Sequence, residues 1–116
     1  MSAMQRNKGA AAEREVAELF RLWGWGGAHR RSTGEESQAD QGRDLKGTEP
    51  YCIQVQNADR TTPELKLQEA EQAATDGQIP VAFIRRTRGS WMVCMRARDW
   101  FKLATPEAAN DAKIPK

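Results

Sequence analysis

The sequence predicts one α/β domain in which a mixed β-sheet is flanked by helices, and three observations support this fold class. An amphipathic helix opens the chain, short runs with strand-like alternation follow it, and a second helical stretch separates the third run from the fourth. A helix between two strands of one sheet indicates a parallel crossover, whereas short connections indicate antiparallel pairing. We therefore expect the order α-β-β-β-α-β-β-α in a domain over residues 6–104, with flexible termini at 1–5 and 105–116.

The first predicted helix begins near Gly9 and ends in the glycine-rich turn after Trp23. Its apolar residues recur at spacings of three and four, which is the stripe of an amphipathic helix. We expect a short strand over 28–33, a polar loop over 34–42, and a second short strand and turn over 43–47. The third strand covers 51–56, where alternation places Gln54 and Gln56 on the same face.

The second half of the chain is predicted from its turn and capping residues. Thr62 and Pro63 indicate the start of a helix, because proline fits the first helical position. That helix is expected to end at Asp76 and Gly77. Two strands over 81–84 and 91–95 follow around a turn at 88–90, and a short helix covers 98–103.

The charge pattern favours nucleic acid as a partner more than the net charge of +2 does. Most of the 18 basic residues are arginines, which bind phosphate through a planar fork of donors, and several of them cluster in the sequence. The simpler alternative is that these arginines only solvate the surface. No apolar run is long enough for a membrane helix and no signal peptide is present, so we expect an intracellular, cytoplasmic protein.

Four side chains could form a centre for phosphodiester hydrolysis. Such chemistry with a divalent metal needs several hard oxygen ligands at one point, together with a group that orients water. Gln54 and Gln56 leave one strand face side by side, and Asp44 can reach the same cleft from the neighbouring strand. Glu13, on the polar side of the first helix, could close the site.

These residues fall in a pattern that resembles a known family. In order and spacing, segments 8–14, 30–34, 43–45 and 53–57 resemble the archaeal and phage Holliday-junction resolvases, which belong to the PD-(D/E)xK, or restriction-endonuclease-like, nuclease superfamily. The resemblance covers roughly residues 6–103. It implies a restriction-endonuclease-like fold and a homodimer that binds four-way DNA junctions during recombination. It also implies symmetric cleavage of two strands with Mg²⁺ or Mn²⁺, and a phage origin would suit the chain.

The resemblance also implies roles for individual residues. Glu13 and Asp44 would bind the metal together with Gln54 and the backbone carbonyl of Val55. Ser32 would lie in the loop near the scissile phosphate. The residues expected to contact DNA are Lys8, His29, Arg30, Arg31, Gln72, Arg85, Arg86 and Arg88.

Two positions depart from the family pattern. Gln54 stands where the family has an acidic residue, which lowers the expected Mg²⁺ affinity, and Gln56 stands where the family has the lysine that positions water and phosphate. One hypothesis is therefore a structure-selective DNA endonuclease in which Gln56 orients water. The alternative is a catalytically weak or inactive module that binds branched DNA or another protein. As a structural alternative, both glutamines could form the solvated face of an edge strand.

Overall fold

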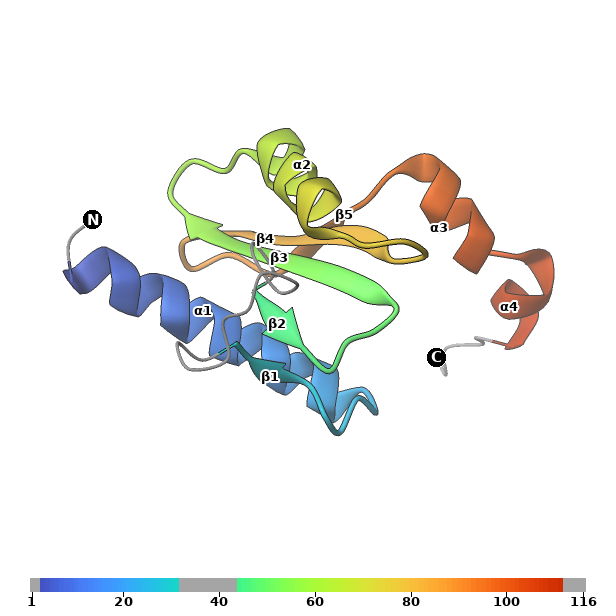
Figure 1. Ribbon diagram of the computed structural model, residues 1–116, viewed down its shortest axis with the longest axis horizontal. Coiled ribbons are helices and arrows are strands. Elements are labelled where there is room, and N and C mark those ends of the chain that lie inside the picture. The colour runs from blue at the N-terminus through green and yellow to red at the C-terminus, as the bar shows by residue number, and fades with distance from the viewer. Residues whose placement is uncertain (1–2, 32–43, 112–116) are drawn as a thin grey trace.

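The structure is a computed structural model that describes residues 3–31 and 44–111 of the 116-residue chain. In chain order its elements are α1 (Ala3–Leu22), β1 (His29–Arg30), β2 (Leu45–Lys46), β3 (Tyr51–Ala58), α2 (Pro63–Ala73), β4 (Ile79–Arg86), β5 (Met92–Cys94), α3 (Ala97–Leu103) and α4 (Pro106–Asp111). The predicted succession of helices and strands is confirmed, with α4 as an additional helix (Figure 1).

The strands form a three-stranded mixed sheet and a separate two-stranded pair. In the larger sheet the order is β3-β4-β5, with β3 parallel to β4 and β4 antiparallel to β5. The helix α2 makes the crossover between the two parallel strands, as the sequence predicted. β1 and β2 pair antiparallel, and the N–H of Asp44, just before β2, donates to the carbonyl of Ile53 in β3 at 3.1 Å. The described architecture is thus a mixed α/β fold whose sheet is flanked by helices.

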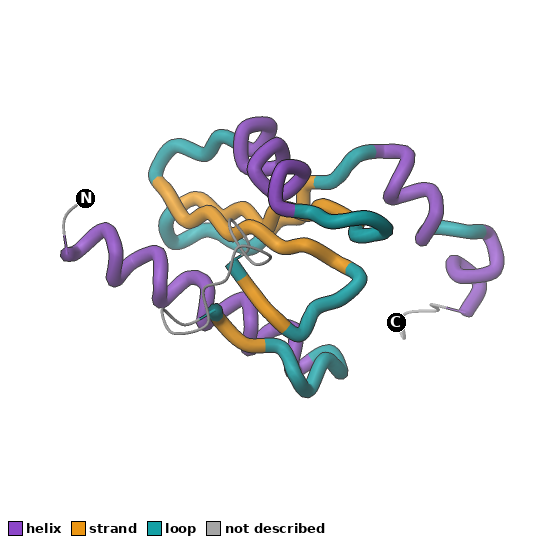
Figure 2. Tube along the Cα trace, in the orientation of Figure 1, coloured by secondary structure: helices purple, strands orange, loops and turns teal. Residues whose placement is uncertain are grey.

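The helices α1 and α2 cover opposite faces of the larger sheet, as Figures 1 and 2 show. On the α1 side, Ile53 and Val55 join the main core. On the α2 side, Leu67 packs with Ala82 and Ile84 of β4. Because side chains alternate along β3, Gln54 points away from the α1 core and toward α2.

The close packing at Gly47 holds β2 beside the start of β1. Its backbone has a positive φ of 78°, and a Cβ at this position would overlap the carbonyl oxygen of Gly27. Only glycine combines that conformation with so close an approach. The strand that follows Asp44 is therefore fixed against the turn that ends α1.

Two helices exceed the predicted limits. α1 begins at Ala3 rather than near Gly9, because a glycine inside a helix costs only about 1 kcal/mol and does not end it. The segment after Thr105, expected to be disordered, contains α4. Thr105 Oγ1 accepts a hydrogen bond from the N–H of Ala108 at 3.0 Å, and Pro106 occupies the first helical position. This threonine–proline pair is the same start signal that correctly located α2.

No helix in the described ranges is long and apolar enough to cross a membrane.

Candidate active site

Two carboxylates meet at the edge of β3 that faces away from β4. Asp44 Oδ2 accepts a hydrogen bond from the N–H of Val55 at 2.8 Å. Glu13 reaches the same place from α1, where its negative charge acts on Asp44. The structure therefore brings together the two acidic residues that the sequence singled out. We refer to Glu13 and Asp44 as the acid pair.

The electrostatic environment of Asp44 is unusual for an aspartate. Burial, followed by the negative charge of Glu13, raises the pKa of Asp44 to about 7, although the Val55 N–H and the charge of Lys66 act in the opposite direction. Burial disfavours the charged form of a carboxyl group, and a neighbouring carboxylate adds to this effect. Near neutral pH, Asp44 can therefore exchange its proton for another cation at little cost.

Residues of β1 and the segment after it support the acid pair. Arg30 Nε donates to Glu13 Oε1 at 2.7 Å in a partly buried ion pair. The backbone N–H of Arg31 donates to the Asp44 carbonyl at 3.2 Å, which fixes the backbone that carries the carboxylate. His29 is exposed on β1. Of these three predicted DNA contacts, Arg30 is thus engaged within the site itself.

The two glutamines of β3 have different environments. Gln54 is only 3% exposed, and its Nε2 has no hydrogen-bond partner among the described residues. Gln56 is fully engaged, since its Nε2 donates to Thr62 Oγ1 at 2.8 Å and its Oε1 accepts from the Thr62 N–H at 2.8 Å. The solvated-face interpretation is therefore wrong for Gln54. The Gln56 amide, predicted to orient water, instead fixes the residue that precedes α2.

The oxygen donors at this edge suit a hard divalent cation. The acid pair supplies two carboxylates, and the carbonyl of Val55 points to the same side of the strand as the N–H that binds Asp44. Within the described ranges, no three or more His, Cys, Asp or Glu side chains are grouped so that they could hold a metal ion. Mg²⁺ is usually held by one or two carboxylates and completes its shell with water and substrate phosphate, so a site with two carboxylates is sufficient.

A second group of predicted DNA-binding residues meets at the turn between β4 and β5. Lys8 Nζ donates to Thr87 Oγ1 in this turn at 2.8 Å, and Arg88 in the turn and Arg86 at the end of β4 are both exposed. A hydrogen bond with Thr87, together with the nearby charges of Lys8, Arg86 and Arg88, lowers the pKa of Asp59. We refer to Lys8, Arg86 and Arg88 as the basic corner.

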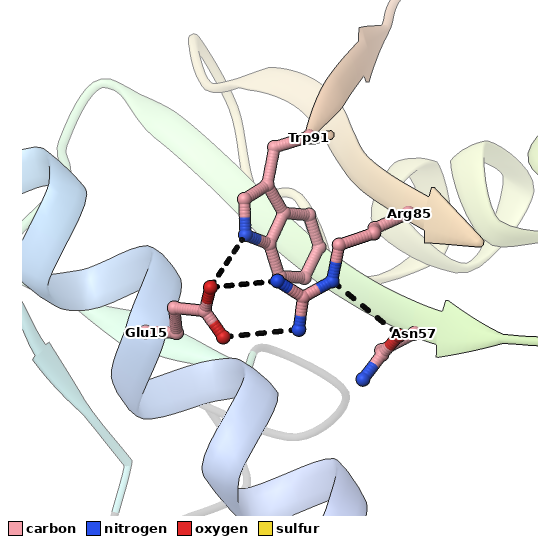
Figure 3. Close-up of polar contacts among 4 residues, drawn as sticks. All are labelled: Glu15, Asn57, Arg85 and Trp91. Carbon is pink, nitrogen blue, oxygen red and sulfur yellow. Dashed lines mark hydrogen bonds and ion pairs between the residues drawn. The ribbon is translucent and has the colours of Figure 1, made fainter. Parts of the chain in front are cut away.

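Arg85 does not belong to this exposed group, although it is adjacent in sequence. Its guanidinium binds both carboxylate oxygens of Glu15 at 2.6 and 3.0 Å, donates to Asn57 Oδ1 at 3.4 Å, and lies 4.3 Å from the ring centroid of Trp91 (Figure 3). Trp91 Nε1 also donates to Glu15 at 3.3 Å. The hydrogen bond from Arg85 lowers the pKa of Glu15. These four residues, the Arg85 cluster, join α1 to the sheet, so the structure gives Arg85 a packing role in place of a phosphate contact.

Two other predicted site residues lie apart from the acid pair. Gln72 is exposed on α2, whereas Leu67 and Ala70 are buried toward the sheet, so Gln72 points to solvent. The helical spacing explains the difference, because residue 72 lies on the opposite side of the helix from 67 and 70. Ser32 falls outside the described residues.

One residue that the sequence analysis did not select, Lys66, lies close enough to lower the pKa of Asp44. It is partly buried on α2, where its backbone N–H donates to the Thr62 carbonyl at 3.0 Å. Lys66 lies four residues before the buried Ala70, so the two residues share one side of the helix. That spacing could have identified Lys66 as a residue that lies beside the sheet.

No protein-family model, curated protein or solved structure matches the chain. The proposed function therefore rests on the side chains at the edge of β3. The restriction-endonuclease-like fold and the resolvase activity stay predictions of the sequence resemblance.

Proposed function

We propose that the protein is a metal-dependent, structure-selective DNA endonuclease of the restriction-endonuclease-like fold, acting as a Holliday-junction resolvase on four-way junctions inside the cell. The observation that carries this proposal is the acid pair, because the pKa of Asp44 is raised to about 7 by burial and by Glu13. Acidic residues that only stabilise a fold are usually neutralised by cationic partners. A carboxylate left with a raised pKa beside a second carboxylate is typical of sites that bind a cation or transfer protons.

Mg²⁺ or Mn²⁺ is the cofactor that this donor set suits. Glu13, Asp44 and the Val55 carbonyl would hold the ion, which when bound supplies an activated water and stabilises charge on the phosphate. The protein's own side chains prepare the site. The Val55 N–H orients the Asp44 carboxylate at 2.8 Å, and Arg30 holds Glu13 at 2.7 Å.

DNA as the substrate is supported by the basic corner. Lys8 contacts the turn that follows Arg86 and carries Arg88, so three cationic side chains gather at one end of the sheet. Contacts to phosphate fix the position of a protein on DNA without reading its sequence. Recognition of a junction by its shape needs contacts of this kind.

A homodimer is part of the proposal because apolar surface is left uncovered on the α1 side of the sheet. A groove of about 240 Å³ is lined by Phe20, Trp25, Phe83 and Leu103 among other apolar residues, and a neighbouring groove of about 230 Å³ shares the first three. Beside the second groove, Trp23 is 83% exposed. Large exposed apolar patches mark interaction surfaces.

A second copy of the chain is the partner that we propose for these grooves. The helix α3 extends away from the sheet and carries Trp100 and Phe101 largely exposed, next to the Leu103 that lines the first groove (Figure 1). One chain thus carries both grooves and protruding aromatic side chains, which suits a symmetric contact between identical surfaces. Light scattering after gel filtration should give a dimer for the wild type and a monomer for Trp23→Gln with Phe101→Gln. A monomeric wild type would contradict the dimer.

The test of the endonuclease is cleavage of a labelled four-way junction. With Mg²⁺ or Mn²⁺ we expect paired cuts at symmetric positions in opposite strands, and with EDTA we expect binding without cuts. A linear duplex of the same sequence serves as the control substrate. A clear gel shift without product at excess protein would contradict the endonuclease.

That result would favour the second candidate, a module that binds branched DNA without cutting it. The observation that favours this alternative is the pair Gln54 and Gln56, which lacks the acid and the lysine of the family pattern. Binding to DNA would still weaken steeply as salt increases. An affinity that does not change with salt would exclude nucleic acid as the ligand of either candidate.

A further inference from the structure

Gln56 places no positive charge beside the acid pair. In the resembled family a lysine at this position would hold the phosphate, but both ends of the Gln56 amide are bonded to Thr62 at 2.8 Å. These two bonds fix the residue that precedes α2. Gln56 therefore determines where the first turn of α2 lies relative to β3.

Lys66 lies one helical turn beyond this anchor. Its N–H donates to the Thr62 carbonyl, so the turn from 62 to 66 is closed, and its side chain is only 21% exposed. α2 follows β3 through a short loop and returns along it (Figure 1). The helical rise from Thr62 to Lys66 is about 6 Å, close to the rise of about 6.6 Å from Gln56 to Gln54 along the strand. Because Gln56 is bonded to Thr62, Lys66 lies near the level of Gln54. The ammonium group is close enough to Asp44 to lower the pKa of that carboxyl.

The ammonium of Lys66 is only weakly held. It forms an ion pair with Glu69 at 2.9 Å, three residues along α2, and the Glu69 side chain is 55% exposed. Ion pairs of this kind on a helix surface contribute little to stability, because water screens them. Lys66 can therefore turn from Glu69 to a bound anion at small cost.

Gln54 supplies a second hydrogen-bond donor, on the face of β3 that lies toward α2. It is buried, and its Nε2 has no acceptor among the described residues. A buried donor without a partner costs about 1–3 kcal/mol, so such a group is expected to have an acceptor in some state of the protein. Strand alternation turns this side chain toward α2, as it does Gln56.

We propose that Lys66 and Gln54 together bind one non-bridging oxygen of a DNA phosphate beside Asp44. Lys66 supplies the positive charge that the family pattern places at position 56, and the Gln54 amide donates the hydrogen bond that fixes the oxygen. Among the described residues, the charged groups linked to this position are Glu13, which pairs with Arg30, and Glu69, which pairs with Lys66. The assignment rests on the proposed nuclease function for the identity of the phosphate, and its tests are independent of cutting.

The first test measures junction affinity and its salt dependence by fluorescence anisotropy in EDTA. Lys66→Met should weaken binding about 3- to 10-fold and reduce the slope of log affinity against log salt by about 0.9, the value for one phosphate contact. Lys66→Arg should retain the slope. Lys102→Met is the matched control, because Lys102 is exposed on α3 and pairs there with Asp99. Equal effects of Lys66→Met and Lys102→Met would overturn the proposal.

The second test separates this role from a structural one. Gln54→Met keeps the side-chain volume and removes the buried donor, so its unfolding midpoint in urea should equal or exceed that of the wild type, while junction affinity falls about 5-fold. A lower midpoint with unchanged affinity would show that Gln54 serves only the fold and would overturn the proposal.

The third test uses inorganic phosphate as the probe and NMR signals of the Gln54 side-chain NH₂, assigned by their loss in Gln54→Met. Phosphate should shift these signals in the wild type and not in Lys66→Met. Unmoved signals would overturn the proposal, whether or not the protein cuts DNA. Shifted signals in a protein that never cuts would support the phosphate site and contradict the endonuclease. Cleavage that Lys66→Met leaves unchanged would support the endonuclease and contradict the site.

Discussion

Two glutamates on α1, only two residues apart, have opposite environments. Glu15 belongs to the Arg85 cluster, where both of its oxygens bind Arg85 and one also accepts from Trp91. The hydrogen bond with Arg85 lowers the pKa of Glu15. Glu13 points toward the edge of β3, where its charge instead contributes to raising the pKa of Asp44.

The difference distinguishes a completed structural contact from an incomplete one. In the Arg85 cluster each charge faces an opposite charge or a ring, so a ligand would gain nothing by entering. At the edge of β3, Arg30 pairs with Glu13, but Asp44 has one backbone donor and a neighbour of its own charge. A divalent cation would relieve this repulsion, which is why we propose the active site there.

The largest effect is expected for cleavage. Asp44→Asn keeps an oxygen that accepts from Val55 but removes the charge of a metal ligand, so junction cleavage should fall about 10³-fold or more. Glu18→Gln, an exposed change on the same helix as Glu13, should leave the rate within a factor of two. Single-turnover rates measure both. An Asp44→Asn protein that cuts like the wild type would remove the acid pair from the chemistry.

The second effect concerns how the free energy of unfolding changes with pH in metal-free buffer. The folded protein holds the Asp44 proton up to a pKa of about 7, whereas an unfolded aspartate releases it near pH 4. The free energy of unfolding contributed by this proton is therefore fully present below about pH 4 and is lost as pH rises to about 7, by on the order of 4 kcal/mol.

Urea unfolding of the wild type and of Asp44→Asn at several pH values measures this difference. The variant should lack the loss between pH 4 and 7 and should be the more stable protein at pH 8. Asp76→Asn, in an exposed turn, provides the control that should follow the wild type. Parallel curves for wild type and Asp44→Asn would show that Asp44 titrates normally.

The fold and the acid pair could be anticipated from the sequence because both depend on local patterns. Apolar spacing located α1, and the alternating pattern of residues 51–56 located β3. The Arg85 cluster could not be anticipated, since Arg85 and Glu15 are 70 residues apart and nothing in either segment marks the other. The bonds of Gln56 to Thr62 were missed for a related reason, because the chain must turn into α2 before the two side chains meet.

The third effect concerns the Arg85 cluster, the second of the two regions compared. Arg85→Met removes the ion pair and the cation–π contact while keeping the length of the side chain, so stability should fall by about 1–2 kcal/mol. Arg86→Met, one residue later and exposed, should change stability by less than about 0.5 kcal/mol. Urea unfolding provides both values. Equal stabilities of the two variants would show that the Arg85 cluster does not support the fold.

The smallest effect concerns the basic corner. Arg86→Gln should weaken junction binding several-fold and reduce the salt slope by about 0.9, while Arg85→Gln, measured where it is fully folded, should leave the slope unchanged. Fluorescence anisotropy over a range of salt concentrations compares them. A reduced slope for Arg85→Gln alone would move the DNA contact from the corner to the cluster.

The most direct measurement of the central claim is Mn²⁺ binding to the wild type, Glu13→Gln and Glu15→Gln, followed by the electron paramagnetic resonance signal of free Mn²⁺. Each variant removes one carboxylate from the same helix, so the two differ only in which region they change. We predict that Glu15→Gln binds Mn²⁺ like the wild type, while Glu13→Gln loses the site. Equal binding by all three proteins, or a loss confined to Glu15→Gln, would contradict the assignment of the acid pair as the metal site.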